Sequence, residues 1–146
     1  MEILSAVAIL GTFIAFKFKG VYHKMISIGL TISVLLVWTC NNYLITISFI
    51  SITLLNIATF VYGLTNKKLN NFEKVCITIM GAFLAVSSIF NLMHLPFAGQ
   101  IKLSMIIPII ITLATFIRGR KLTREMSFMI FWLFYATLEF LKLWTH

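Results

Sequence analysis

The stretch YLITISFISITLLNIATFVYGLTNKK, residues 43–68, decides the fold class of this chain. It carries no charged residue until Lys67 and Lys68. About twenty apolar residues form a helix long enough to cross the hydrocarbon layer of a bilayer, and flanking lysines mark where such a helix reaches the lipid headgroups. We therefore expect a membrane-spanning helix over Tyr43–Leu64.

The rest of the chain has a similar composition. Hydrophobic residues make up 60% of its 146 residues and charged residues 11%, so too few polar groups are present to cover a water-facing surface. In a soluble protein the formal net charge of +8 would suggest nucleic acid binding. Here the basic residues lie at the ends of apolar stretches, where they contact lipid headgroups. We expect the lipid bilayer to be the main partner, and no nucleic acid.

Six apolar segments of suitable length follow one another along the chain. Their expected bounds are Ile3–Phe18, Tyr22–Thr39, Tyr43–Leu64, Phe72–Leu95, Ile101–Ile117 and Arg124–Trp144. Every backbone group within a span must form its hydrogen bonds internally, so each span is expected to be a helix. The expected fold is all-α, a polytopic membrane bundle of six transmembrane helices that forms one transmembrane domain over residues 1–146. Five helices are the alternative, because the division at Asn41 and Asn42 falls in an uncharged stretch barely long enough for two spans.

The basic residues predict the orientation. Ten of the twelve Lys and Arg residues fall into three clusters, which are Lys17, Lys19 and Lys24, then Lys67, Lys68 and Lys74, and finally Arg118, Arg120, Lys121 and Arg124. Assigning successive loops alternately to the two sides of the membrane puts all three clusters on one side. Basic loops are typical of the cytoplasmic side. We expect a multi-pass protein of the bacterial inner membrane with both termini outward.

Two local features add expectations. Pro108 lies inside the fifth segment, where it should kink the helix. Cys40 and Cys76 fall near opposite membrane boundaries, so they cannot pair with each other in this topology.

A short pattern recurs near the end of three expected helices. It reads LGTFI at residues 10–14, IATFV at residues 57–61 and LATFI at residues 113–117, and each copy is followed by a glycine and a basic loop. Parallel duplication of a helical hairpin would produce this pattern. Coincidence among small, Thr and Phe residues of an apolar sequence is the alternative.

Four polar residues are candidates for function. Glu139 is the only acidic residue well inside an expected span, and burying it without a partner would be costly. Tyr135 and Lys142 lie at helical spacing from it and offer local partners, so we favour a structural role over proton or cation handling. Polar faces on the third and fourth helices and the end of the fourth helix supply the other three, Asn56, Asn91 and His94. Such faces usually hold helices together and less often line a solute path.

The sequence lacks the patterns that catalysis needs. It contains no Asp, no Ser or Cys at a recognisable spacing from His, no phosphate-binding glycine motif and no paired metal-ligand histidines. We therefore expect no catalytic residue, no metal and no cofactor, and we do not expect an enzyme.

The stretch IFNLMHLPFAG, residues 89–99, resembles the helix-end signature Phe-Lys-x-Met-His-Trp-Pro-Gly-Ala. That signature recurs in small inner-membrane proteins of Bacteroidota, a group that includes GldL, the motor protein of gliding motility and type 9 secretion. His94 matches the histidine of the signature and Pro96 its proline. Asn91 stands where the family has lysine, and Leu95 where it has tryptophan.

The resemblance implies a bacterial inner membrane and a shared helical-hairpin ancestry. In the motor protein the lysine and histidine work with a glutamate of the following helix. Here the following segment, Ile101–Ile117, contains no acidic residue. The resemblance therefore does not imply motor function.

Two functions follow as hypotheses. The first is a non-enzymatic subunit or accessory protein that docks through its lipid-embedded faces onto a second copy or a larger membrane complex. The second is a transporter or channel for a small solute or an ion such as the proton, with Asn56, Asn91, His94 and Glu139 lining or gating the path. The positions of these residues distinguish the two functions. Convergence inside the bundle and scatter over its outer surface indicate different classes of protein.

Overall fold

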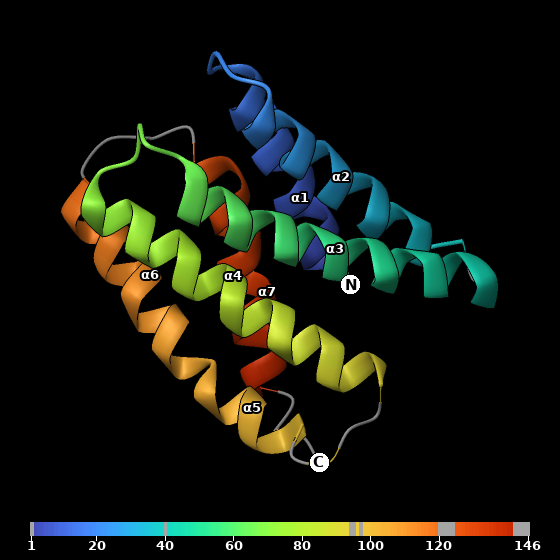
Figure 1. Cartoon of the computed structure of the whole chain (residues 1–146). Helices are drawn as coiled ribbons and strands as arrows, with labels where there is room; N and C mark the ends of the chain where they lie inside the picture. Colours follow the sequence, from blue (N-terminus) through green and yellow to red (C-terminus); the bar gives the residue numbers. More distant parts are fainter. Residues whose placement is uncertain (1, 40, 94–95, 97, 120–124, 142–146) are drawn as a thin grey trace.

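The computed structural model describes residues 2–39, 41–93, 96, 98–119 and 125–141. This part of the chain is all-helical, as expected. Its helices are α1 (Glu2–Phe16), α2 (Tyr22–Val37), α3 (Asn42–Thr65), α4 (Asn71–Leu92), α5 (Ala98–Ser104), α6 (Ile106–Gly119) and α7 (Met126–Leu141). Figure 1 shows α3 and α4 lying side by side, with α1 and α2 on one side of this pair and α6 on the other. Each expected segment contains one helix, except the fifth, which contains α5 and α6.

The interruption between α5 and α6 falls at Met105, three residues before Pro108. Proline has no N–H to donate to the carbonyl of Ser104, and its ring crowds that carbonyl. The chain makes a tight turn instead, in which the Met105 N–H donates to the Lys102 carbonyl at 3.2 Å. The kink expected in the fifth segment is therefore present as a break of one residue.

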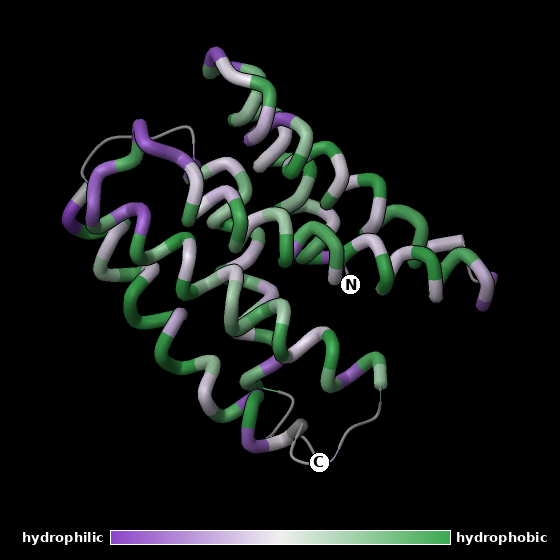
Figure 2. The backbone as a smooth tube through the Cα atoms, in the orientation of Figure 1, coloured by the Kyte–Doolittle hydropathy of each residue, from purple (hydrophilic) through white to green (hydrophobic). Residues whose placement is uncertain are grey.

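The outer surface of the bundle is apolar. Large apolar side chains are exposed on every helix, and examples are Phe13 at 68% and Ile110 at 59% exposed. Figure 2 shows the hydrophilic segments mainly at the connections between helices. Polar side chains are buried in the interior alongside apolar ones, among them His23, Ser27, Ser48, Asn56, Thr59, Ser88, Glu125 and Glu139. This distribution is the reverse of the one that water favours.

Three helical regions are long and apolar enough to cross a bilayer, and they are Asn42–Thr65, Asn71–Leu92 and Gly99–Arg118. This finding indicates a membrane protein. The apolar helices α1, α2 and α7 have 15 or 16 residues. At 1.5 Å per residue they measure about 24 Å or less, which is shorter than a hydrocarbon layer of about 30 Å. Helix length and composition thus support three membrane spans. They do not test the other three of the six expected spans.

The helices α3 and α4 approach each other closely at two glycines. A Cβ atom added to Gly81 of α4 would lie 2.5 Å from the backbone nitrogen of Phe60 on α3. One added to Gly63 of α3 would lie 2.8 Å from the backbone nitrogen of Thr78. Small residues at such contacts are typical of helix packing in membranes. These contacts fix the rotation of the two helices that carry Asn56 and Asn91.

The described parts of the three basic clusters lie at one end of the bundle. Figure 1 shows the connections at residues 17–21 and 66–70 at this end. The third cluster joins them, because the Arg118 guanidinium lies 5.2 Å from the centre of the Phe72 ring at the start of α4. Lys102 lies toward the opposite end, near the end of α7. The side of a membrane that this end faces stays a prediction.

The recurring threonines of the short pattern have different surroundings. Thr12 hydrogen-bonds to the Ser27 carbonyl and the Thr31 hydroxyl on α2. Thr59 and Thr115 each donate to the carbonyl four residues back in their own helix, and Thr59 also accepts a hydrogen bond from Trp132. The hairpin duplication stays a prediction.

Of the two cysteines, Cys76 is buried, with its thiol 3.6 Å from the Thr112 hydroxyl oxygen. Cys40 lies outside the described residues.

Candidate functional site

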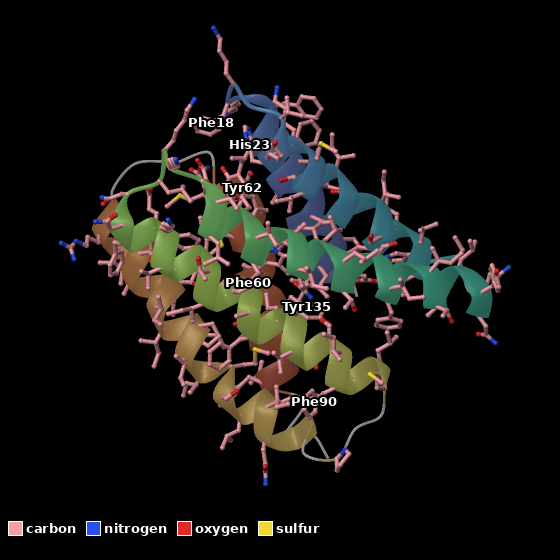
Figure 3. The ribbon with its side chains drawn as sticks, in the orientation of Figure 1. Phe18, His23, Phe60, Tyr62, Phe90 and Tyr135 are labelled. Carbon is pink, nitrogen blue, oxygen red and sulfur yellow. The ribbon has the colours of Figure 1, made fainter. Side chains whose placement is uncertain are left out.

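A cavity of about 380 Å³ lies between α3, α4, α5 and α7 at the end of the bundle opposite the basic clusters. Its polar lining comes from all four helices and consists of Thr53, Ser88, Asn91, Lys102, Tyr135 and Glu139. Its apolar lining consists of Phe49, Ile52 and Leu92. We call this space the polar cavity. Figure 3 labels Tyr135 at this site and Tyr62 nearer the basic end.

An ion pair joins α5 to α7 at the polar cavity. The Nζ atom of Lys102 lies 3.7 Å from Oε2 of Glu139. Glu139 is 5% exposed, and the Lys102 side chain is 23% exposed. A charge-assisted hydrogen bond between such groups measures about 2.7–2.9 Å, so this pair is in electrostatic contact without a tight hydrogen bond. Removing two charges from water is costly, and a loose pair recovers only part of that cost.

The structure adds a partner to those expected for Glu139. Tyr135 does lie close enough for the Glu139 charge to act on it. Lys142, the other expected partner, lies outside the described residues. Among the described residues, the basic partner of Glu139 is Lys102, which lies outside the three basic clusters. Its isolation from the three basic clusters was the one signal that could have marked it.

The side chain of Asn56 lies behind the wall of the polar cavity. It is fully buried, and its Nδ2 atom donates to the Ser88 hydroxyl at 2.7 Å and more weakly to the Leu84 carbonyl at 3.4 Å. Ser88 is in turn hydrogen-bonded to Tyr135. The Oδ1 atom of Asn56 has no hydrogen-bond partner among the described residues. Asn56 therefore holds a lining residue in place from α3.

Three of the four candidate residues converge. Asn91 and Glu139 line the polar cavity, and Asn56 reaches it through Ser88. The fourth candidate, His94, lies outside the described residues. The described candidates therefore face the interior of the bundle.

A second buried carboxylate, Glu125, lies at the other end of α7 and was missed by sequence analysis. It is 6% exposed, and its Oε1 atom accepts a hydrogen bond from the Tyr62 hydroxyl at 3.1 Å. It was missed because it falls beside Arg124 at the expected boundary of the last segment. A signal was present, because Glu125 and Glu139 are four helical turns apart and so share a face of α7.

Glu125 also lines a second cavity of about 680 Å³, together with Glu73, Arg118 and Cys76. This cavity lies at the basic end and contains none of the residues that sequence analysis proposed. Among the described residues, no group of three or more His, Cys, Asp or Glu side chains is placed to hold a metal ion.

The described residues form a helical bundle with an apolar outer surface and a partly open pocket that Lys102, Glu139 and other polar side chains line. No family model, curated protein or solved structure matches this chain. The histidine that carries the resemblance to the Bacteroidota proteins is outside the described residues, so that resemblance stays a prediction.

Proposed function

We propose that this chain is a small multi-pass membrane transporter that binds a polar solute in the polar cavity. The observation that carries the proposal is the convergence of Asn91, Lys102 and Glu139 on one pocket, whose lining also includes the exposed side chains of Phe49 and Leu92. Polar groups that serve only to hold helices together would satisfy one another in pairs and leave no room between them. A space of about 380 Å³ is within the usual size range of small-molecule sites. The open space between these polar groups therefore favours transport over docking onto a partner.

The proposed setting is the bacterial inner membrane, crossed by six helices. The regions already long enough are α3, α4 and the pair α5–α6. Flanking residues that snorkel and local thinning of the bilayer allow the shorter α1, α2 and α7 to cross as well. By the positive-inside rule the basic end faces the cytoplasm. The polar cavity then lies toward the outer side, where both termini are placed.

In this proposal α5 is the part of the cavity wall that moves when the solute enters. It is short, it carries Lys102, and it is separated from α6 by the break at Met105. A break beside a proline provides a hinge, and hinge motion about a few residues is a common way to close a site over a ligand. In this scheme the contact between Lys102 and Glu139 holds α5 against α7 when the site is closed.

Flux through proteoliposomes tests the proposed function. The purified chain is reconstituted, and the uptake of labelled ions, sugars, amino acids and carboxylates is measured separately. We expect uptake of one class, which the Glu139→Gln variant reduces. A matched control is Glu73→Gln, because Glu73 lies at the opposite end of the bundle in the capping box of α4. Absence of flux for every class, together with a stable co-purifying membrane protein, would replace this proposal with the docking hypothesis.

A further inference from the structure

We propose that the solute is a zwitterion whose ammonium and carboxylate groups are separated by one carbon atom, as in an α-amino acid with an apolar side chain. This inference rests on the proposed function and names the chemical class of its substrate. It is carried by the charges, the spacing and the apolar lining of the polar cavity.

The net charge of the site favours a solute with no net charge. The charged lining residues that the structure describes are Lys102 and Glu139, one of each sign. A monovalent cation or anion would add one charge that these two lining residues leave unbalanced, and an uncompensated charge at membrane depth is costly. A zwitterion keeps the sum at zero. It also brings a group of opposite sign to Lys102 and to Glu139.

The spacing of the ion pair favours neighbouring charges on the solute. A bound zwitterion would place its carboxylate on Lys102 and its ammonium on Glu139, so that four charges alternate around a square. Because the two protein charges are 3.7 Å apart, the two solute charges must also lie within a few ångström of each other. In an α-amino acid the nitrogen and the carboxyl carbon are about 2.5 Å apart, as the N–Cα and Cα–C bond lengths require. Each further methylene group lengthens the chain between the charges.

Lys102 has hydrogen-bonding capacity to spare for this arrangement. An ammonium group carries three N–H donors. At 3.7 Å the contact with Glu139 is too long for a hydrogen bond, and no other hydrogen bond of its Nζ atom is present among the described residues. A solute carboxylate can therefore bind Lys102 directly without displacing an existing hydrogen bond.

The remaining lining divides the polar cavity into a polar and an apolar part. Thr53, Asn91 and Ser88 bring hydroxyl and amide groups near the ion pair. Ser88 is held by Asn56, which fixes part of the polar wall before any solute binds. The rest of the wall is made by Phe49, Ile52 and Leu92. Apolar walls of this kind favour an aliphatic side chain over a second charged group.

Binding to the purified full chain in mild detergent tests the proposal by isothermal titration calorimetry. The probes are glycine, L-alanine and L-leucine, compared with two analogues of leucine that each lack one charge, 3-methylbutylamine and 4-methylpentanoate. A third analogue, β-homoleucine, adds one methylene between the charges. We expect at least one α-amino acid to bind, and each analogue with a single charge to bind about thirtyfold more weakly or worse, as the loss of one partner of a buried charge pair predicts. Equal binding of a single-charge analogue, or binding of no α-amino acid, would overturn the proposal.

Charge variants separate solute binding from a purely structural ion pair. We expect Lys102→Met and Glu139→Gln to lose binding of α-amino acids. The exchanged variant Lys102→Glu with Glu139→Lys restores both charges, and a zwitterion can reverse its orientation to match, so binding should recover. The control Lys24→Met removes a lysine that lies on the Phe16 ring at the other end of the bundle and should bind normally. If the single variants fold and bind as the unmodified chain does, the ion pair does not recognise the solute.

The proteoliposome experiment distinguishes this inference from the proposed function. Transport of another class of solute, with no binding of α-amino acids, would overturn the inference and leave the transporter proposal standing. Absence of all flux would overturn both.

Discussion

Replacement of Lys102 by methionine tests whether the buried ion pair is real, and the structure sets the size of the effect. The substitution keeps much of the apolar stem of the side chain but removes the positive charge 3.7 Å from Glu139. Glu139 is 5% exposed and cannot turn fully to water. Removing one partner of a buried ion pair costs about 3–5 kcal/mol. Because the Lys102 side chain is 23% exposed, we expect a loss near the lower end, about 3 kcal/mol of unfolding free energy.

The assay is equilibrium unfolding in mixed micelles, with helical circular dichroism as the signal. The double variant Lys102→Met with Glu139→Leu removes both charges, and replacing a whole buried pair by apolar residues is often neutral or stabilising. We therefore expect the double variant to recover most of the stability that Lys102→Met loses. A single variant that loses less than about 1 kcal/mol, the range of an exposed pair, would refute the buried pair. So would a double variant as unstable as the single one.

Three further predictions use the same unfolding assay. We expect Gly81→Ala to lower the free energy of unfolding by about 1–3 kcal/mol, because its new Cβ would meet the backbone of Phe60. The control Gly29→Ala should lose less, because its Cβ meets only a leucine side chain that can move. Equal losses would show that α3 and α4 are not in backbone contact. We expect Asn56→Leu to change the free energy of unfolding by no more than about 1 kcal/mol, because the lost hydrogen bond to Ser88 is offset by removal of a buried oxygen that has no partner among the described residues. A loss of several kcal/mol would mean that this oxygen does accept a hydrogen bond. We expect Trp132→Phe to lower the free energy of unfolding by about 1–2 kcal/mol, since it removes the 3.1 Å hydrogen bond from the indole N–H to the Thr59 hydroxyl and leaves a small void. An unchanged unfolding midpoint would contradict that hydrogen bond.

The helices could be placed from sequence because their signals are local. Long apolar runs, bounded by lysine clusters or Asn pairs, locate α3 and α4 to within a few residues. Pro108 locates the break in the fifth segment, because the missing N–H acts on the preceding turn of its own helix. None of these signals requires knowledge of which helices are neighbours.

The site could be predicted only in part, because it depends on how the helices rotate against one another. The polar faces around Asn56 and Asn91 were visible in the sequence, but contacts at Gly63 and Gly81 turn them toward the interior. In a soluble helix the buried face is more apolar than the exposed face, and this difference repeats along the sequence. A helix whose outer face contacts lipid is apolar on both faces, so the sequence does not show which face is buried. Lys102 lies on α5 and its partner Glu139 lies on α7, so no spacing within one helix reveals their contact.

Glu125 was missed for a different reason. Its position beside a basic cluster is typical of a solvated residue at a membrane boundary. Only the packing of α3 against α7 brings the Tyr62 hydroxyl to its carboxylate. Charged residues at expected boundaries therefore need a three-dimensional structure before they can be assigned to lipid, water or interior.

Labelling of a cysteine at position 91 tests whether water reaches the polar cavity from outside the cell. In a chain with Cys40 and Cys76 replaced by serine, Asn91→Cys places a thiol in the lining of the polar cavity, and Ile110→Cys places one on the apolar outer surface. Thiols react as thiolates, so a charged, membrane-impermeant thiol reagent modifies only a cysteine that water can reach. We expect the reagent, added outside intact cells, to modify position 91 and to spare position 110. Position 91 as unreactive as position 110 would contradict a water-accessible site inside this bundle.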